Sequence, residues 1–205
     1  MTKPVSASII SRAVDVLRKD GVIVFPTDTV YGLGGNALVA QVVSRVHEIK
    51  RRPPGLTFPL LLADTSCLTV VAQDVSDTAW RLIRHFLPGG LTLILPRSPL
   101  IPEALCDGKD TIGVRIPDHA VTLALIRGMG APLIGTSANV SGRLPVRSCP
   151  ELDPEIKNKV DFIIDGGKCP GVESTVINVT VDPPRLIREG IVSRGDIQEI
   201  CGALL

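Results

Sequence analysis

The stretch Gly21-Val22-Ile23-Val24-Phe25-Pro26-Thr27-Asp28-Thr29-Val30-Tyr31 decides the fold class of this chain. Residues 22–25 form a short continuous apolar run, typical of a strand buried on both faces, and Pro26 closes it. Residues 7–19 precede the run with apolar side chains at helical spacing, and we expect Gly21 to be the left-handed cap of that helix. A helix followed by a buried strand indicates an α/β domain.

The rest of the chain continues this alternation, with more strands than helices. We expect helices at 39–49, 74–87, 120–127 and 194–201, the last capped by Ser193. We expect strands at 59–63, 91–95, 111–115, 133–135, 162–164, 175–179 and 185–187. Several neighbouring strands late in the chain predict a twisted open α/β sheet of mixed direction flanked by helices. Residues 142–159 are polar and contain prolines, and we expect a functional loop there.

Composition narrows the class of protein. A chain of 205 residues with 44% hydrophobic residues predicts one domain over residues 1–205. The net charge of +1 and 3% aromatic content give no argument for a chain-wide nucleic-acid or membrane surface. Five scattered cysteines without a C-x-x-C pair indicate reduced thiols, and the three histidines show no zinc or iron spacing. With no signal peptide or long apolar run, we expect a cytoplasmic protein.

A cluster of three cations, Lys50-Arg51-Arg52, runs into two prolines. The helical conformation is sterically disfavoured for a residue that precedes a proline, so we expect Arg52 to be extended. In an extended chain, residues two apart face the same way, which would bring Lys50 and Arg52 together and point Arg51 away. Seen alone, such a cluster is more often a solvated turn.

The motif Ser137-Ala138-Asn139 repeats this spacing with neutral side chains that hydrogen-bond ribose or phosphate oxygens. Paired with the basic cluster, it predicts a triphosphate clamp in one cleft. The G-x-S-x-G nucleophile elbow is a poorer interpretation, because the final glycine is missing and no histidine is coupled to Ser137. The segment 32–37 matches a dinucleotide fingerprint only formally, and a tight turn with close backbone approach is the simpler interpretation.

Two arginines lie in apolar strands, where a buried charge needs a partner. The partner of Arg115 is either a structural carboxylate or a ligand phosphate or carboxylate. For Arg188 the adjacent Glu189 offers a local ion pair. The segment 27–31 carries hydroxyls, a carboxylate and a phenol where open α/β sheets bind ligands, although a turn that satisfies its own backbone explains it equally well. Ser174 is either a binding or a capping residue.

In order along the chain, the segments PTDTVYGLG, K-x-R, LPGGLT, GVRIP, GTSANVSG, ESTV and REG resemble the YrdC-like family of threonylcarbamoyl-AMP synthases, from about Val22 to Gly190. The resemblance implies a twisted open sheet with a concave, positively charged cleft. It also implies a nucleotidyltransferase that converts L-threonine, bicarbonate and ATP to threonylcarbamoyl-AMP and pyrophosphate. This is the first step of threonylcarbamoyladenosine modification of tRNA, and the product would pass to a tRNA threonylcarbamoyl transferase complex.

The resemblance also implies roles for individual residues. Lys50 and Arg52 would be the catalytic cations on the triphosphate, and Mg²⁺ would arrive with ATP rather than on protein ligands. The implied ATP-binding residues are Lys50, Arg52, Thr111, Ser137, Asn139 and Arg188. The implied threonine-binding residues are Thr29, Tyr31, Arg115 and Ser174, with Arg115 pairing the substrate carboxylate.

The chain departs from the family pattern at Ala63, where many relatives carry histidine, and it resembles the short single-domain form. Two other functions compete with the synthase. An RNA-binding module could use the same basic cleft for a phosphodiester backbone, and weak RNA binding is also compatible with the enzyme. The carbamoyl-adenylate chemistry of hydrogenase-maturation proteins uses a related fold, but the length of this chain disfavours it.

Overall fold

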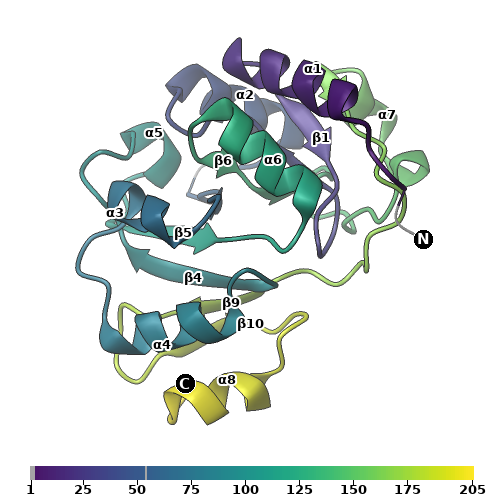
Figure 1. Cartoon of the computed structure of the whole chain (residues 1–205). Helices are drawn as coiled ribbons and strands as arrows, with labels where there is room; N and C mark the ends of the chain where they lie inside the picture. Colours follow the sequence, from purple (N-terminus) through teal and green to yellow (C-terminus); the bar gives the residue numbers. More distant parts are fainter. Residues whose placement is uncertain (1–2, 54) are drawn as a thin grey trace.

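The computed structural model describes residues 3–53 and 55–205 of the chain, and it contains two mixed β-sheets (Figure 1). The four-stranded sheet has the order β7-β2-β1-β8 and the six-stranded sheet the order β10-β9-β4-β5-β3-β6. The strands are β1 (Ile23–Phe25), β2 (Gly32–Gly34), β3 (Leu60–Leu61), β4 (Leu91–Pro96), β5 (Thr111–Arg115), β6 (Leu133–Ile134), β7 (Thr136–Ser137), β8 (Phe162–Ile163), β9 (Thr175–Asn178) and β10 (Arg185–Arg188).

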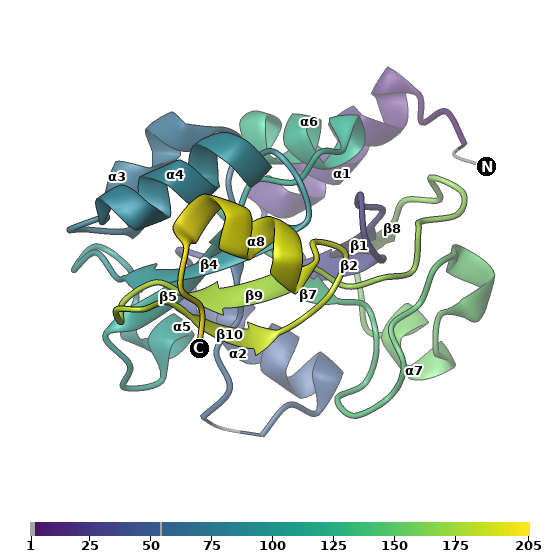
Figure 2. The same cartoon turned by 90° about the horizontal axis from the view of Figure 1, so that it is seen from below.

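Helices flank both sheets. The helices α1 and α6 pack on each other beside β1, while α4 and α8 cover one face of the β4-β9-β10 part of the larger sheet (Figures 1 and 2). The helices are α1 (Ala7–Arg18), α2 (Ala40–Lys50), α3 (Leu68–Val71), α4 (Asp77–Phe86), α5 (Glu103–Cys106), α6 (Ala120–Met129), α7 (Pro154–Lys157) and α8 (Arg194–Cys201), with 3-10 turns at Thr65–Cys67 and Cys149–Glu151. No helix in the described ranges is long and apolar enough to span a bilayer.

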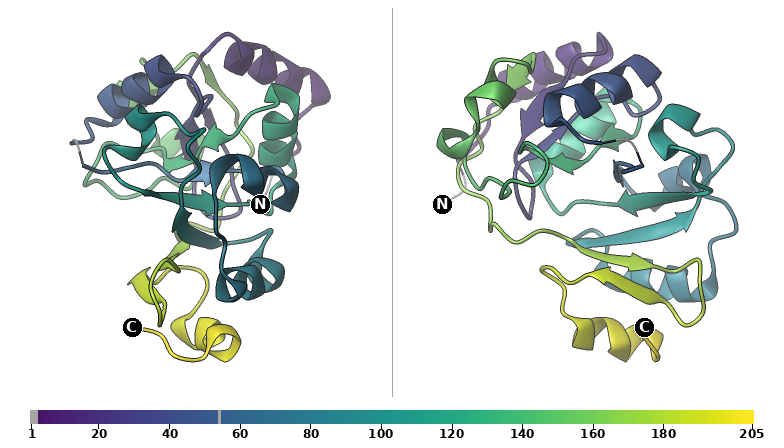
Figure 3. Two further views of the ribbon diagram at one scale, coloured as in Figure 1. Left: turned by 90° about the vertical axis from the view of Figure 1, so that its left-hand side faces the viewer. Right: turned by 180° about the vertical axis from the view of Figure 1, so that it is seen from behind.

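The expected mixed strand direction is confirmed. β1 runs parallel to β8 and antiparallel to β2, and β4 runs parallel to β9 and antiparallel to β5. The strands form two sheets rather than one, however, and Figure 3 shows that the segment containing β9, β10 and α8 projects from the rest of the molecule. The ligand-facing surface can therefore be built from both sheets.

Side-chain alternation along β4 separates a core face from an open face. Leu91, Leu93 and Leu95 are buried in the main core, whereas Thr92 and Ile94 point the other way and line a cavity. This period of two is what a strand imposes when its two faces have different surroundings.

Three local expectations need correction. Asp20, with φ 61°, takes the left-handed position after α1, and Gly21 instead lies where a β-carbon would collide with Val16. The segment 32–37 includes a strand, β2, which was not expected. Residues 142–159 are not a structureless loop, because they contain α7 and a 3-10 turn, and Arg143 pairs with Asp153. The Ser193 cap of α8 is confirmed, since its side chain accepts the Asp196 amide.

The close approach predicted for the glycines of segment 32–37 is confirmed at Gly34. A β-carbon there would overlap the carbonyl oxygen of Ile134, which belongs to the other sheet. The backbone of Gly35 also accepts the Ile134 amide at 2.9 Å, so the two sheets meet here through main-chain atoms. Only glycine allows this distance.

We predict that Gly34→Ala lowers the free energy of unfolding by about 2–4 kcal/mol, because the clash is with backbone that cannot rotate away. Urea denaturation measures the change. The matched control is Gly195→Ala in α8, where the nearest atom to the new β-carbon is 3.7 Å away. That variant should raise the free energy of unfolding slightly, by less than about 1 kcal/mol. Equal losses in both variants would contradict the proposed contact between sheets.

Candidate functional site

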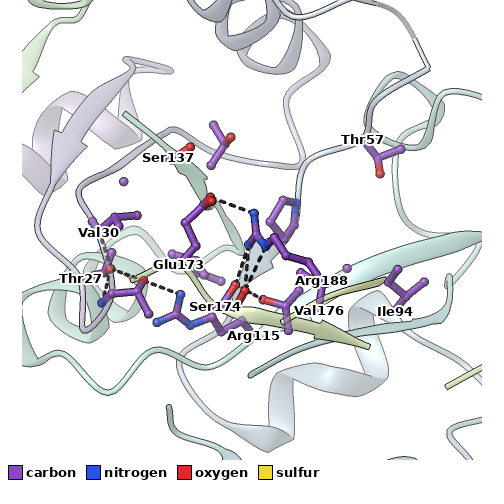
Figure 4. A pocket seen from close by; sticks show the side chains of 18 of the residues that line it. Thr27, Val30, Thr57, Ile94, Arg115, Ser137, Glu173, Ser174, Val176 and Arg188 are labelled. Atoms are coloured by element: carbon purple, nitrogen blue, oxygen red, sulfur yellow. Dashed lines mark hydrogen bonds and ion pairs between the residues drawn. The ribbon is translucent and has the colours of Figure 1, made fainter. Parts of the chain in front are cut away.

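A cavity of about 320 Å³ lies between the two sheets and collects residues from distant parts of the chain (Figure 4). The open face of the larger sheet forms one wall, and β2, β7 and the segments beside them form another. Its polar lining residues are Thr27, Thr29, Tyr31, Arg52, Thr57, Thr92, Lys109, Thr111, Arg115, Thr136, Ser137, Glu173, Ser174 and Arg188. Most of the residues predicted from the sequence are therefore brought to one place.

Lys50 lies behind the cavity wall rather than in the cavity. It is the last residue of α2 and only 2% exposed. Its ammonium donates to the backbone oxygens of Ser137 at 2.5 Å and Asn139 at 2.7 Å, and to the Asn139 side-chain oxygen at 3.3 Å. Burial, together with the smaller effect of the Arg52 charge, lowers the pKa of Lys50 to about 7, and the charge of Glu173 opposes this shift.

The predicted meeting of the K-x-R and S-x-N motifs is thus confirmed, but the local geometry that was expected is wrong. Lys50 is helical and Arg51 is left-handed with φ 50°, so the two cations do not converge through an extended i, i+2 pair. The left-handed residue ends α2 and turns the chain toward the cavity. Arg51 points away as expected, and it pairs with Glu155 at 2.7 Å.

Arg52 lies in the cavity wall and is held by its own loop. Its guanidinium donates to the carbonyls of Leu56 at 3.1 Å and Thr57 at 2.9 Å, and it lies 5.0 Å from the centre of the Phe58 ring. Burial lowers the pKa of Arg52, and the charge of nearby Arg188 lowers it further. Arg52 stays protonated at physiological pH, so it presents a fixed positive charge to the cavity.

The buried charge of Arg115 has a structural carboxylate as its partner. Its guanidinium donates to Asp28 at 2.5 Å, to the Thr29 hydroxyl at 2.9 Å and to the Gly89 carbonyl at 2.9 Å. Arginine has five N–H groups, so these three bonds leave two for a ligand in the cavity. The Thr27 hydroxyl hydrogen-bonds backbone groups of the same turn. The turn therefore satisfies its own backbone polar groups and also orients Arg115.

Arg188 does not pair with the adjacent Glu189, which corrects the simpler sequence interpretation. Its guanidinium contacts the Glu173 carboxylate at 2.9 Å and the Ser174 carbonyl at 2.9 Å, as Figure 4 shows. Glu189 instead accepts the backbone amide of Arg194. The Ser174 hydroxyl lies 2.9 Å from that of Thr92, so Thr92, Ser174 and Arg188 form the polar part of the cavity floor, beside the apolar Ile94 and Val176.

Two predicted residues, Tyr31 and Asn139, use their side-chain polar atoms within the protein, and a third, Thr111, faces the cavity. The Tyr31 hydroxyl donates to the Gly167 carbonyl at 2.8 Å and accepts the Gly166 amide at 3.0 Å, and burial raises its pKa. Asn139 is buried beside Lys50, where its side-chain oxygen accepts from the Ser137 hydroxyl at 2.5 Å. Thr111 begins β5 and lines the cavity. Their roles with ligands stay predictions.

The sequence interpretation missed five polar lining residues: Thr57, Thr92, Lys109, Thr136 and Glu173. Thr92 alternates with the leucines of β4, so its place on the open face could have been predicted from the period of two. Glu173 adjoins Ser174, yet nothing in the sequence shows that it faces the cavity. Lys109 donates to the Gly55 carbonyl at 2.7 Å, a contact between residues 54 apart.

The cavity carries more positive than negative charge. In the part of the chain that the structure describes, its lining contains the cations Arg52, Lys109, Arg115 and Arg188 and one carboxylate, Glu173. Such an excess in a partly enclosed space favours a ligand with several negative charges.

Comparisons with known proteins point to one family. Residues 15–190 match the model of the Sua5/YciO/YrdC family, which is described as telomere recombination. The chain is 38% identical over 193 residues to threonylcarbamoyl-AMP synthase of Pyrococcus abyssi, covering 94% of this chain and 57% of that protein. It is 35% identical to the uncharacterized protein YciO of Escherichia coli, covering 93% of this chain and 91% of that one.

The fold is shared with a solved structure of P. abyssi Sua5 complexed with L-threonine. That structure matches with a TM-score of 0.95 at 36% sequence identity, and the match covers 99% of this chain and 61% of the solved one. The chain therefore spans just over half the length of these longer relatives.

We predict that Asp28→Ala lowers the free energy of unfolding by about 2–4 kcal/mol, because it leaves the Arg115 charge buried without its carboxylate. The two side chains are only 7% and 15% exposed. The control is Lys3→Ala, which breaks the exposed pair with Asp165 and should leave the urea midpoint unchanged. Added sulfate should restore part of the loss in Asp28→Ala, since an anion can replace the carboxylate. A midpoint equal to that of the unaltered protein would contradict the pairing.

Proposed function

Because the chain belongs to the Sua5/YciO/YrdC family, we propose that it is a threonylcarbamoyl-AMP synthase. The reaction joins L-threonine, bicarbonate and ATP to give threonylcarbamoyl-AMP and pyrophosphate, and the product serves the threonylcarbamoyladenosine modification of tRNA. The observation that carries the proposal is the cavity with four cations and one carboxylate, which suits a polyphosphate beside a small amino acid. The five free cysteines agree with action in the cytoplasm, where the product would pass to a transferase complex.

The adenylation step needs positioning and charge more than a protein nucleophile. The carbamate carboxylate attacks the α-phosphorus of ATP, the bond to the β-phosphate oxygen breaks, and pyrophosphate leaves with the electron pair. Two anions must be held together while the negative charge on the leaving group grows. Arg52, Arg188 and Lys109 are placed to offset that charge, and Mg²⁺ is part of the ATP substrate rather than of the protein.

Lys50 supports the phosphate side indirectly. Its ammonium fixes the two backbone carbonyls that flank Ala138, so the Ser137 hydroxyl is held at the cavity wall. We assign Ser137, Thr111 and Arg188 to the nucleotide, with Lys50 and Asn139 acting through the backbone and side chain of this segment.

Threonine would bind at the end of the cavity formed by Arg115, Thr29 and Ser174. The two free N–H groups of Arg115 suit a carboxylate, and the hydroxyls suit the polar atoms of the amino acid. Selection of threonine over serine rests on one methyl group, worth about 1–3 kcal/mol in a fitted pocket. Discrimination should therefore be real but incomplete.

An RNA-binding module is the less favoured function. The cavity volume of about 320 Å³ is in the range of small-molecule sites, and a phosphodiester backbone would use an open groove instead. Binding to RNA would weaken steeply with salt and would not depend on threonine. ATP binding should instead be coupled to threonine.

The experiment that tests the function is direct. Purified protein is incubated with ATP, Mg²⁺, bicarbonate and L-threonine, and pyrophosphate and the adenylate are measured. Both products should appear only with threonine and bicarbonate present. Pyrophosphate formed at the same rate without threonine would overturn the assignment.

We predict that Arg52→Gln lowers turnover by at least about 10²-fold, because it removes a charge that stabilises the leaving pyrophosphate. The matched control is Arg51→Gln, which changes the neighbouring residue in the same way but faces Glu155 rather than the cavity. The control should retain at least about half of the turnover. Equal effects in the two variants would remove Arg52 from the phosphate site.

We also predict that the protein takes up protons when ATP binds at pH 8. The pKa of Lys50 is about 7, so its amine is mostly neutral at pH 8, and a polyanion nearby favours the charged form and raises that pKa. ATP itself is fully ionised at pH 8 and releases no proton. Calorimetry in two buffers of different ionisation enthalpy gives the number of protons taken up.

The uptake at pH 8 should be lost in Lys50→Met, which removes the titrating nitrogen. The difference in proton uptake between the unaltered protein and this variant should approach zero below pH 6, where Lys50 is already charged. Proton release at pH 8, or the same uptake in Lys50→Met, would show that another group titrates.

A further inference from the structure

Glu173 is a carboxylate in a cavity whose other charged lining residues, within the described part of the chain, are cations. Among the residues that the structure describes around the cavity, it is the acidic one, and it precedes β9 next to Ser174. Its Oε1 accepts from Arg188 at 2.9 Å, and its side chain is 34% exposed. Oε2 receives no hydrogen bond from the described residues, so this oxygen is available to a ligand.

The position of this carboxylate is between the two ends of the cavity. Ser174, its neighbour in sequence, contacts Thr92 on the floor, and Arg188 links it to the phosphate side. Figure 4 shows the Glu173 side chain extending above Ser174, with its carboxylate toward the Arg188 guanidinium. It is also close enough to Lys50 for its charge to act on the pKa of that amine.

An amino acid enters such a cavity as a zwitterion. Arg115 suits its carboxylate, but the α-ammonium group is repelled by the four cations unless an acceptor with negative charge faces it. Glu173 meets that requirement. Building on the proposed function, we infer that Glu173 binds the α-ammonium group of the amino-acid substrate and accepts the proton which that group must lose.

The proton step balances with the reactants already named. The ammonium gives one proton to the Glu173 carboxylate and becomes a neutral amine. The amine nitrogen then forms a bond to the carbon of bicarbonate, and one water molecule leaves, giving the carbamate anion. Arg188 keeps the carboxylate in place, and the Glu173 carboxyl group returns its proton to solvent after the product departs.

The test compares two ligands that differ only at the α-carbon, where one carries an ammonium group and the other a hydroxyl group. L-Threonine and its 2-hydroxy acid analogue, 2,3-dihydroxybutanoate of matching stereochemistry, are titrated into the full chain and into Glu173→Gln. The glutamine oxygen can still accept from Arg188, so the local structure is kept. Glu199→Gln on α8 is the control for loss of one exposed acid.

In Glu173→Gln, we expect the dissociation constant of threonine to rise about 10- to 100-fold, the usual effect of losing a charged hydrogen bond. The hydroxy acid should bind with a change of less than about threefold. ATP should bind as tightly as before or more tightly, since one negative charge has left a site for an anion. Glu199→Gln should change none of the three.

The pH dependence of turnover separates proton acceptance from binding. The deficit of Glu173→Gln should shrink as the pH rises through the pKa of the threonine amine, because more substrate then arrives without the proton. A deficit that is constant with pH would overturn proton acceptance by Glu173.

Two binding results would overturn the inference as a whole. An equal loss for threonine and the hydroxy acid would mean a structural role only. Weaker ATP binding would place Glu173 on the phosphate or magnesium side. If the unaltered protein binds no threonine at all, the proposed function itself fails, and the inference fails with it. Because that measurement uses the unaltered protein, it distinguishes failure of the proposed function from failure of the inference about Glu173.

Discussion

The buried ammonium of Lys50 is the contact on which the site depends. It joins the end of α2 to the backbone of Ser137, the last residue of β7, and of Asn139 just after it. These residues are 87 and 89 positions further along the chain. A lysine that is 2% exposed is costly unless its hydrogen bonds are satisfied, and here three oxygens surround it. The same contact fixes where α2 ends, and Arg52 follows two residues later. The position of Ser137 at the cavity wall and the end of α2 before Arg52 thus depend on one buried cation.

The cavity itself holds charges that repel one another. Arg52 and Arg188 are close enough for Arg188 to lower the pKa of Arg52, and both are held by backbone carbonyls rather than by solvent alone. Asp28 and Glu173 offset part of the excess at Arg115 and Arg188. Repulsion among the remaining positive charges raises the free energy of the folded protein without ligand, and a polyanionic ligand lowers it. The folded chain therefore holds these cations in place before a polyanionic ligand binds, which favours its binding.

Much of this arrangement could be predicted from local sequence, and the rest could not. The strand at 111–115 and the helix at 194–201 follow from apolar periodicity and a serine cap, which are local properties. The proximity of Lys50 to Ser137 and Asn139 was predicted from motifs rather than from periodicity, but the hydrogen bonds of its ammonium to their oxygens were not predicted. The left-handed Arg51 was missed because a following proline says only that Arg52 avoids helix. Glu173 was missed because its orientation depends on Arg188, a contact made only in the folded sheet.

Under the proposed function, the division of the open sheet face would let one cavity hold two unlike substrates. β5 carries Thr111 at one end and Arg115 at the other, four residues apart, so its open-face side chains extend from the nucleotide end to the amino-acid end. In the same sheet, β9 and β10 lie beyond β4 and bring Ser174, which directly precedes β9, and Arg188 to the cavity, while the smaller sheet contributes Ser137 to the opposite wall. The larger sheet carries Thr111, Arg115 and Arg188, and the smaller sheet adds Ser137 from β7. The contact at Gly34, where the backbones of the two sheets meet, holds the two walls of the cavity relative to each other, so the proposed chemistry, as well as the fold, depends on it.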